Sequence, residues 1–193
     1  MNREYRSYKL IYFFASLVFR PLYRIKTTGR ENIPDGAAII CPMHSHWADP
    51  VFMALSIGKR HHLHIVGKAE LFSTRLLARI FNSAGAISVK RGDNDIAAVR
   101  KMMKYLKNGE KLLIFPEGTR VKAGCESRAK RGATYLSYKL NVPIVPVYLP
   151  REKKAFHTVE IVIGKPYYVG GDTYGTSASD ELLQKMLSLG RKI

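Results

Sequence analysis

The sequence predicts an α/β fold: a single domain with a largely parallel central sheet flanked by helices, plus an N-terminal interfacial helix. Short segments rich in isoleucine, leucine and valine alternate with longer segments whose apolar residues recur every three or four positions. The short segments are mostly apolar rather than alternating with polar residues, which is typical of strands buried on both faces of a parallel sheet. With 193 residues, 46% of them hydrophobic, the chain can form one substantial core.

The strands are expected where aliphatic and β-branched residues form short runs bounded by polar or turn-forming residues. The run LLIF, for example, leads into Pro116 and then Gly118, which favour a turn. Strands are therefore expected at 37–41, 63–66, 86–89, 111–115, 144–149 and 158–163.

The helices are expected between these strands, where apolar residues recur at helical spacing. Asp49 followed by Pro50 is a strong start signal, because aspartate caps helix N-termini and proline fits the first helical position. The glycine-rich stretch 169–180 is expected to be a loop before the last helix. Helices are expected at 50–57, 71–81, 96–106, 129–140 and 179–189.

Residues 1–27 are expected to form a helix at a membrane interface, followed by the main domain at 28–193. The apolar run LIYFFASLVF at 10–19 is shorter than the ~20 residues that a spanning helix needs. FRPLYR follows it in place of a small-residue cleavage site. A peripheral, monotopic helix on the cytoplasmic face of the membrane is expected, and an ordinary helix buried on the domain is the alternative. Basic residues flank the run, where they can contact headgroups: Arg3, Arg6, Lys9, Arg20, Arg24 and Lys26.

The formal net charge of +17 and the pI of about 10.0 predict attraction to an anionic partner. A membrane surface, nucleic acid, and an acidic protein or substrate all satisfy this expectation, and a generally basic proteome is the alternative explanation. Cys41 and Cys125 lack the spacing of a disulfide framework or a metal site. A reducing cytoplasmic setting is therefore the simpler interpretation.

The stretch CPMHSHWADP at 41–50 contains a candidate general base. His44 comes where a strand gives way to a loop, and Asp49 lies five residues on, where its carboxylate could reach the imidazole. A carboxylate on one ring nitrogen fixes the tautomer and leaves the other nitrogen as a base. No Gly-x-Ser-x-Gly elbow occurs in the chain, so the expected nucleophile is a substrate hydroxyl. Helix capping is the structural alternative for Asp49, and it leaves His44 unexplained.

Two further strand ends carry basic residues. In LLIFPEGTR at 112–120, Arg120 can bind a phosphate through two parallel hydrogen bonds, and Gly118 lets backbone amides approach the same anion. In GAISVKRG at 85–92, Lys90 and Arg91 end another strand. Each arginine alone is compatible with a solvated surface charge. Because parallel sheets keep their sites at strand ends, the two segments are expected to form an anion pocket beside the histidine.

In this order, the motifs resemble the glycerolipid acyltransferase family, typified by the 1-acylglycerol-3-phosphate acyltransferases. The resemblance covers roughly residues 28–169, and FPEGTR with its correctly ordered partners is its most specific part. The motifs that carry it are His44…Asp49, GKAELF at 67–72, Gly85…Arg91, FPEGTR at 115–120, AKRGATYLS at 129–137 and VPIVPV at 142–147.

The resemblance implies acyl transfer from acyl-CoA or acyl-acyl carrier protein to the free hydroxyl of lysophosphatidic acid, giving phosphatidic acid in phospholipid biosynthesis. It implies no acyl-enzyme, no metal and no cofactor beyond the acyl thioester as co-substrate. By this resemblance His44 is the general base and Asp49 orients it, Lys68 is a further anion contact, and Pro143 lies on the acyl-chain side. The residues implied to position the phosphate and glycerol portion are Arg91, Glu117, Gly118, Thr119 and Arg120.

Three positions depart from the family pattern. Met43 stands where the family usually has asparagine, His46 where it has a small polar residue, and Ser88 where proline is common. These changes bear on acceptor specificity more than on acyl transfer itself. Glycerol-3-phosphate or a different lysolipid is therefore the alternative acceptor.

Two other features of the sequence suggest functions other than an acyltransferase. RHHLH at 60–64 places His62 and His64 on one face of a strand, but no acidic or cysteine partner follows at a matching spacing, so a polar strand edge is expected rather than a metal site. A basic module that binds membranes or nucleic acid would explain the charge. It would not explain His44, Asp49 and FPEGTR in order, so no nucleic-acid partner is expected.

Overall fold

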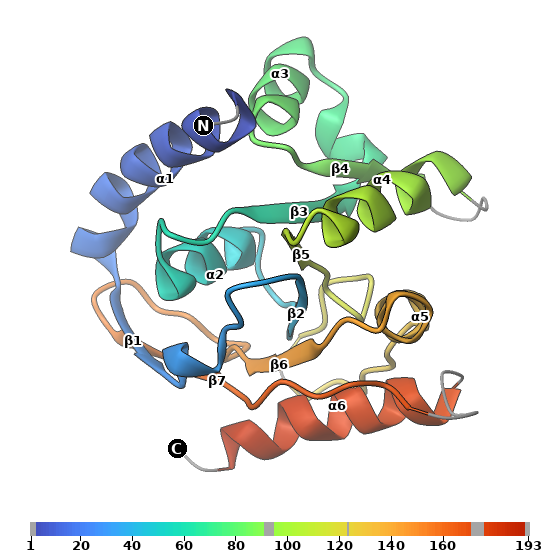
Figure 1. Cartoon of the computed structure of the whole chain (residues 1–193). Coiled ribbons are helices and arrows are strands. Elements are labelled where there is room, and N and C mark those ends of the chain that lie inside the picture. Colours follow the sequence, from blue (N-terminus) through green and yellow to red (C-terminus); the bar gives the residue numbers. More distant parts are fainter. Residues whose placement is uncertain (1–2, 91–94, 123, 171–175, 192–193) are drawn as a thin grey trace.

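The computed structural model describes residues 3–90, 95–122, 124–170 and 176–191. Its strands are β1 (Arg24–Thr28), β2 (Ala38–Pro42), β3 (Leu63–Lys68), β4 (Ile87–Val89), β5 (Lys111–Leu113), β6 (Ile144–Tyr148) and β7 (Thr158–Ile163). They form a seven-stranded sheet in the order β1-β7-β6-β2-β5-β3-β4 (Figure 1). Paired strands are parallel except β6 and β7. The expected α/β class with a largely parallel sheet is therefore confirmed.

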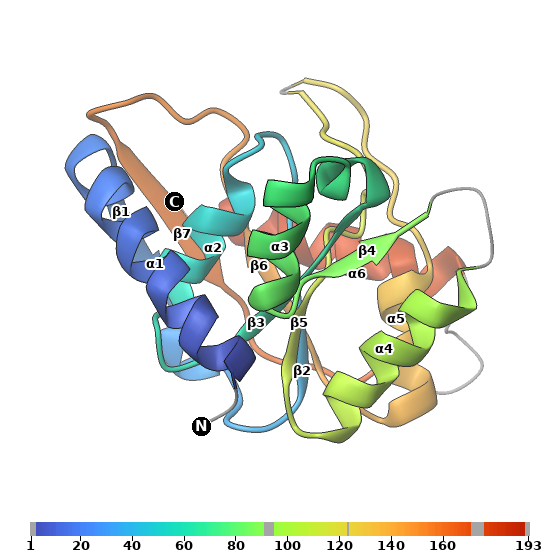
Figure 2. The ribbon, with the colours of Figure 1, turned by 90° about the horizontal axis from the view of Figure 1, so that it is seen from above.

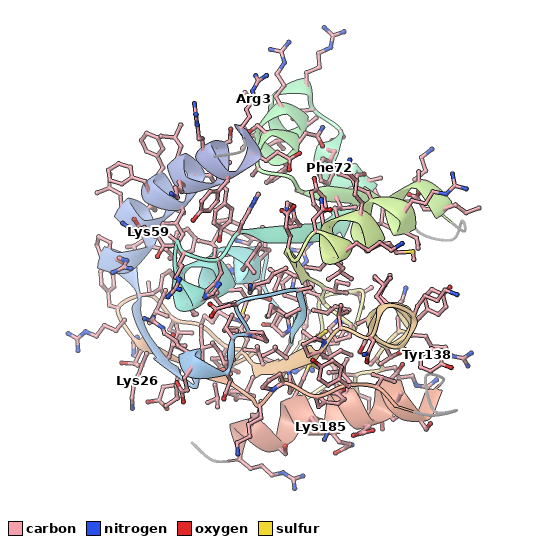
Figure 3. The ribbon with its side chains drawn as sticks, in the orientation of Figure 1. Arg3, Lys26, Lys59, Phe72, Tyr138 and Lys185 are labelled. Atoms are coloured by element: carbon pink, nitrogen blue, oxygen red, sulfur yellow. The ribbon has the colours of Figure 1, made fainter. Side chains whose placement is uncertain are left out.

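Helices cover both faces of this sheet (Figures 1 and 2). The helices are α1 (Arg3–Leu22), α2 (Asp49–Ile57), α3 (Arg75–Ser83), α4 (Ile96–Lys107), α5 (Gly132–Leu140) and α6 (Thr176–Gly190), with short 3₁₀ helices η1 (Arg30–Asn32) and η2 (Ala69–Phe72). Adjacent residues of a strand point to opposite faces, so Ile40 packs into the cluster with α1 and α2, whereas Ile39 packs into the cluster with α4, α5 and α6. Basic residues are spread around the outside, as Lys26, Lys59 and Lys185 show in Figure 3.

All the expected strands form, and β1 is an addition. Its sequence RIKTT alternates between exposed and half-buried positions, so it lacks the continuous apolar run that marks the inner strands. It pairs in parallel with β7 from Arg24 to Thr28. Residues 24–27, which were expected to belong to the N-terminal segment, are therefore part of the sheet.

Three helix boundaries also differ from expectation. The helix expected at 71–81 is divided into η2 and α3, because Thr74 adopts an extended conformation and its hydroxyl caps α3 by accepting from the Leu77 N–H. Helix α5 begins at Gly132 rather than at 129. Helix α6 begins at Thr176, so the end of the expected loop 169–180 is helical; its residues 171–175 lie outside the described chain.

Helix α1 combines features of both expectations for the N-terminus. One face packs on the domain, with Tyr8 buried and Tyr5 and Phe19 against the same core cluster. Another face exposes more than half of each of five apolar side chains at helical spacing: Leu10, Phe13, Phe14, Leu17 and Val18. Among the described residues, no helix has both the length and the apolarity required to cross a bilayer. We call this set of five residues the α1 stripe.

Candidate active site

The candidate site lies where the carboxyl ends of neighbouring parallel strands meet. β2 pairs with β5 and β6, and β5 pairs with β3, all in parallel. The loops that follow these strands therefore emerge at one edge of the sheet. They carry His44 after β2, the FPEGTR turn after β5, Lys68 at the end of β3, and Lys153 after β6.

The His44 imidazole is held on two sides. Its Nδ1 lies 2.8 Å from Oδ2 of Asp49, and its ring stacks on Phe115 with the ring centres 4.1 Å apart. An ionised carboxylate can only accept a hydrogen bond, so the His44 Nδ1 carries the proton and donates it. In the neutral imidazole the other ring nitrogen, Nε2, is then the unprotonated one and can accept a proton. The His44 side chain keeps 18% of its surface exposed, so a substrate can reach it.

Asp49 organises the loop that precedes it. Its Oδ2 accepts hydrogen bonds from the backbone N–H groups of Ser45 and His46 at 2.7 and 2.8 Å, as well as from His44. Its Oδ1 forms an ion pair with the Lys153 ammonium at 2.9 Å. Burial alone would raise the pKa of Asp49, but the hydrogen bond from His44 and the charge of Lys153 hold it below the ordinary value. The carboxylate is therefore ionised at neutral pH.

Helix capping does not account for this aspartate. Asp49 is already the first residue of α2, and the cap position is Ala48, which makes no side-chain hydrogen bond. The Asp49 carboxylate instead bonds backward to the loop, as the functional interpretation requires. Pro50 does occupy the first turn of the helix, as expected.

The buried Glu117 holds the same loop from a second side. Its Oε2 accepts a 2.6 Å hydrogen bond from the His44 backbone N–H. Its Oε1 accepts from the Ser127 hydroxyl and pairs with the Arg151 guanidinium at 2.7 Å. Glu117 does not line the cavity beside His44. The role implied for it, contact with the phosphate and glycerol portion, is therefore not supported by its position; it fixes the histidine backbone.

A cavity of about 660 Å³ opens beside the His44 ring. Its polar residues include three cationic side chains, Lys68, Arg120 and Lys130, and the hydroxyl of Thr119. Much of the remaining lining comes from apolar side chains of two strands and two helices: Ile65, Val66, Val89, Val99, Met102, Ala133 and Leu136. A cavity with cationic and apolar parts fits a ligand that carries both an anionic group and a hydrocarbon chain.

The structure places the other expected site residues as follows. Gly118 lines the cavity together with Thr119, Arg120 and Lys68. Pro143 is buried immediately before β6, where its carbonyl accepts from the Ile39 N–H, and it does not line the cavity. Arg91 lies outside the described residues.

The two unusual loop residues occupy different surroundings. Met43 is buried in the core cluster beneath the loop. His46 does not line the cavity; its ring lies beside Trp47 and its Nδ1 accepts from the Ala48 N–H at 3.3 Å. Of the two loop histidines, His44 is the one whose ring reaches the cavity.

Sequence reasoning missed Lys153, Arg151 and Lys130. Lys153 and Arg151 follow β6 and neutralise the two buried carboxylates of the site. The Lys130 side chain packs on Gly118 and lines the cavity. The signal that could have identified the first two is their position just after a strand adjacent to β2, since the carboxyl ends of such strands meet.

Comparison with known proteins identifies the family to which the chain belongs. A model of the acyltransferase family matches residues 24–150. The chain is 29% identical over 169 residues to the chloroplastic 1-acyl-sn-glycerol-3-phosphate acyltransferase LPAT1 of Arabidopsis thaliana, covering 80% of this chain and 47% of that protein. It is 28% identical over 150 residues to the 1-acyl-sn-glycerol-3-phosphate acyltransferase of Bacillus subtilis, covering 75% and 74%. The match to the family model covers more than half of the chain, which therefore belongs to the acyltransferase family.

A solved structure has the same fold. The crystal structure of the 1-acyl-sn-glycerophosphate acyltransferase PlsC from Thermotoga maritima superposes with a TM-score of 0.76 at 22% identity, covering 95% of this chain and 78% of that one. The chain spans about half the length of the two plant relatives that it matches. The segment that matches the family model includes the His44 loop and the FPEGTR turn.

Replacing Lys153 by methionine should destabilise the protein, because it removes the buried ion pair with Asp49. Loss of one partner leaves the Asp49 charge uncompensated, which costs about 3–5 kcal/mol of unfolding free energy. The Asp49 pKa is lowered in the folded state, so its contribution is complete above the ordinary carboxyl value of ~4 and is lost as the pH falls through the folded value. Without Lys153 the folded pKa of Asp49 rises, so Asp49 contributes less stability at neutral pH and the variant loses less stability on acidification than the wild type does.

Urea unfolding of the wild type and of Lys153→Met between pH 3 and pH 7 measures this effect. Lys154→Met is the matched control, because Lys154 is exposed. Equal stability and equal pH profiles for the two variants would contradict the assigned ion pair.

Proposed function

We propose that this protein transfers an acyl group from an acyl thioester, on coenzyme A or acyl carrier protein, to the free hydroxyl of lysophosphatidic acid. The product would be phosphatidic acid. The observation that carries the proposal is the 2.8 Å contact between His44 Nδ1 and Asp49 at the wall of a cavity with cationic and apolar parts. The family assignment and the names of the relatives support the same reaction.

The chemistry follows from the tautomer of His44. Nε2 accepts the proton of the acceptor hydroxyl as its oxygen attacks the thioester carbonyl carbon. The tetrahedral intermediate expels the thiolate, which takes the proton back from the imidazolium. The Asp49 carboxylate stabilises that imidazolium and keeps Nδ1 as the protonated nitrogen. No acyl-enzyme forms and no cofactor besides the thioester co-substrate takes part.

The cavity offers a separate place for each part of the acceptor. Arg120 and Lys130 would bind the phosphate, with Thr119 as a neutral donor and Lys68 as a further cation. The apolar walls would hold the hydrocarbon chains. Arg91 is expected to join the phosphate contacts by its place in the family motif, whereas Glu117 acts by positioning the His44 backbone.

The first test measures thioester consumption with lysophosphatidic acid in anionic vesicles. His44→Ala should lower turnover by ~10²–10⁴-fold, the range that general-base catalysis contributes. His157→Ala is the matched control, because His157 is exposed and outside the cavity lining. Ordinary turnover in a folded His44→Ala protein would contradict the mechanism. Absence of wild-type turnover with any donor would instead indicate another acceptor, such as glycerol-3-phosphate or a different lysolipid.

We also infer that the protein works as a peripheral enzyme on an anionic membrane at its cytoplasmic face. The α1 stripe supplies exposed apolar side chains, and such a helix face can insert among lipid headgroups. Trp47, which is 66% exposed and lines the cavity, lies against Phe19 of α1 with ring centres 6.3 Å apart. A membrane-bound α1 would therefore bring the cavity mouth close to the lipid surface.

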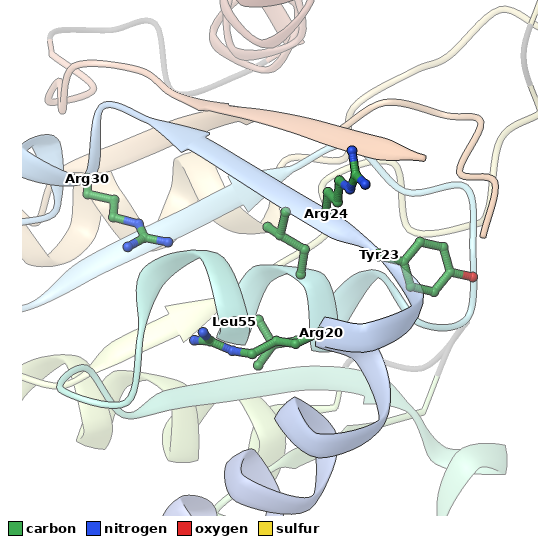
Figure 4. Close-up of a pocket in the computed structure, with 6 residues that line it drawn as sticks. Arg20, Tyr23, Arg24, Arg30 and Leu55 are labelled. Atoms are coloured by element: carbon green, nitrogen blue, oxygen red, sulfur yellow. The ribbon is translucent and has the colours of Figure 1, made fainter. Parts of the chain in front are cut away.

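A basic pocket at the end of α1 supports attraction to anionic headgroups. Arg20 from α1, Arg24 from β1 and Arg30 from η1 surround a space of about 240 Å³ together with Tyr23 and Leu55 (Figure 4). Guanidinium groups suit phosphate, because they donate two parallel hydrogen bonds. The same basic surface would also attract an acidic acyl carrier protein, so charge does not choose between the two donors.

Placing charge on the α1 stripe should release the protein from membranes without unfolding it. Phe13→Asp with Leu17→Asp changes two exposed residues, and loss of two inserted apolar side chains should lower vesicle partitioning by at least ~10-fold. Tyr138→Asp with Tyr168→Asp adds the same charge at exposed aromatic residues outside α1. Cosedimentation with anionic vesicles at constant ionic strength measures both variants. Equal partitioning of the two double variants would show that the stripe does not bind lipid.

A further inference from the structure

A histidine–carboxylate cluster lies at the opposite edge of the sheet from the candidate active site. His62 and His64 stand at the amino end of β3, whereas the active-site residue Lys68 ends the same strand. Glu110 immediately precedes β5, the strand that pairs with β3. The amino ends of two parallel neighbours therefore bring two imidazoles and a carboxylate together. The acidic partner that RHHLH lacks in the sequence comes from 46 residues away from His64.

Both imidazoles are oriented by backbone carbonyls. His62 Nε2 lies 2.8 Å from the carbonyl oxygen of Ala84, and His64 Nδ1 lies 2.9 Å from that of Gly85. A carbonyl oxygen can only accept, so each of these nitrogens carries a proton and donates it. In the neutral tautomers the lone pairs then belong to His62 Nδ1 and His64 Nε2. This arrangement, with the outer N–H held by a backbone carbonyl, is typical of metal-binding histidines.

The two lone pairs converge on one carboxylate oxygen. Glu110 Oε2 lies 4.0 Å from His62 Nδ1 and 2.5 Å from His64 Nε2. The three potential ligand atoms all lie within 4.8 Å of one another. Two ligands of a tetrahedral zinc ion, with bonds of about 2.0–2.1 Å, stand about 3.3 Å apart. The Glu110 side chain is 28% exposed, so it can rotate by the small amount that this spacing requires.

We propose that His62, His64 and Glu110 form a site for a divalent first-row transition-metal ion, for which Zn²⁺ is the natural probe. Two imidazole nitrogens and one carboxylate oxygen are ligands that zinc prefers, whereas magnesium and calcium prefer an all-oxygen set. The partly exposed Glu110 provides the path of entry, since His64 is fully buried. The proposal does not depend on the acyl-transfer chemistry at the other edge of the sheet.

The surroundings hold the imidazoles in place before any ion binds. The His64 ring stacks on Tyr105 with ring centres 3.5 Å apart, and the His62 ring lies 4.8 Å from that of Tyr8 in α1. Gly85 has a φ of +77° and approaches so closely that a Cβ there would stand 2.6 Å from His64 Nδ1. A larger residue at Gly85 would displace the ring.

The cluster also joins α1 to the sheet. The Tyr105 hydroxyl, on the ring that stacks with His64, donates to the Glu4 carboxylate of α1 at 3.1 Å. Tyr5 and Tyr8 of α1 contact the His62 ring. A bound ion would therefore stabilise the attachment of the helix that carries the α1 stripe. Without an ion, a charged His64 paired with Glu110 is the alternative arrangement of the same residues.

Zinc binding to the metal-free protein tests the proposal by competition with a chromophoric chelator, and cobalt absorption reports the ligand geometry. Wild type should bind one Zn²⁺ and show the spectrum of a low-coordinate Co²⁺ ion. Glu110→Gln keeps the size of the side chain, and His62→Phe keeps a ring. Each variant should weaken Zn²⁺ binding by at least ~10–100-fold, because loss of an outer-shell partner alone already costs that much. His61→Phe is the matched control, because His61 is adjacent in sequence but outside the cluster.

Circular dichroism of the metal-free variants separates loss of binding from loss of fold. The thermal midpoint should rise with Zn²⁺ in the wild type and in His61→Phe, and should stay constant in Glu110→Gln. Wild type that binds no Zn²⁺ would overturn the proposal in favour of the His64–Glu110 ion pair. Binding that survives both Glu110→Gln and His62→Phe would overturn it too, because the ion would then lie elsewhere, for example at the His44 loop.

Discussion

The architecture of the candidate active site depends on one carboxylate that is fully removed from water. The Asp49 side chain has no exposed surface, and a buried charge is tolerated only when it is paired and hydrogen-bonded. The loop from His44 to His46 supplies three of its hydrogen bonds and Lys153 supplies the counter-charge. Satisfying this carboxylate therefore dictates the path of the loop and, with it, the orientation and tautomer of His44.

A second buried carboxylate repeats the arrangement at the FPEGTR turn. Glu117 binds the His44 backbone through one oxygen and Arg151 through the other. Arg151 and Lys153 both belong to the segment after β6, so the ends of β2, β5 and β6 are linked by charged contacts around one histidine. Motifs that are distant in the sequence therefore act on one loop. Glu117 of the FPEGTR turn holds the His44 backbone from outside the cavity, whereas Thr119 and Arg120 of the same turn line the cavity.

Much of the fold and part of the site could be predicted from the sequence. Inner strands such as β2 are apolar at every position, so composition identifies them; β1 is an edge strand with alternating exposure, and no local pattern separates it from a loop. His44 and Asp49 are close in sequence, so their contact could be inferred from spacing. The direction of Glu117, the partners Lys153 and Arg151, and the meeting of His62 with Glu110 depend on which strands are neighbours. The order of the strands is a property of the whole sheet, so no single segment of the sequence predicts it.

We expect the buried Asp49 carboxylate to hold His44 with Nδ1 protonated and Nε2 free to act as a base. Nitrogen-15 NMR of the imidazole in labelled protein at neutral pH, assigned by comparison with His44→Ala, measures this directly. The wild-type His44 should show a protonated Nδ1 and an unprotonated Nε2, and the opposite tautomer should become populated in Asp49→Asn. A wild-type His44 that carries its proton on Nε2 would contradict this role of Asp49.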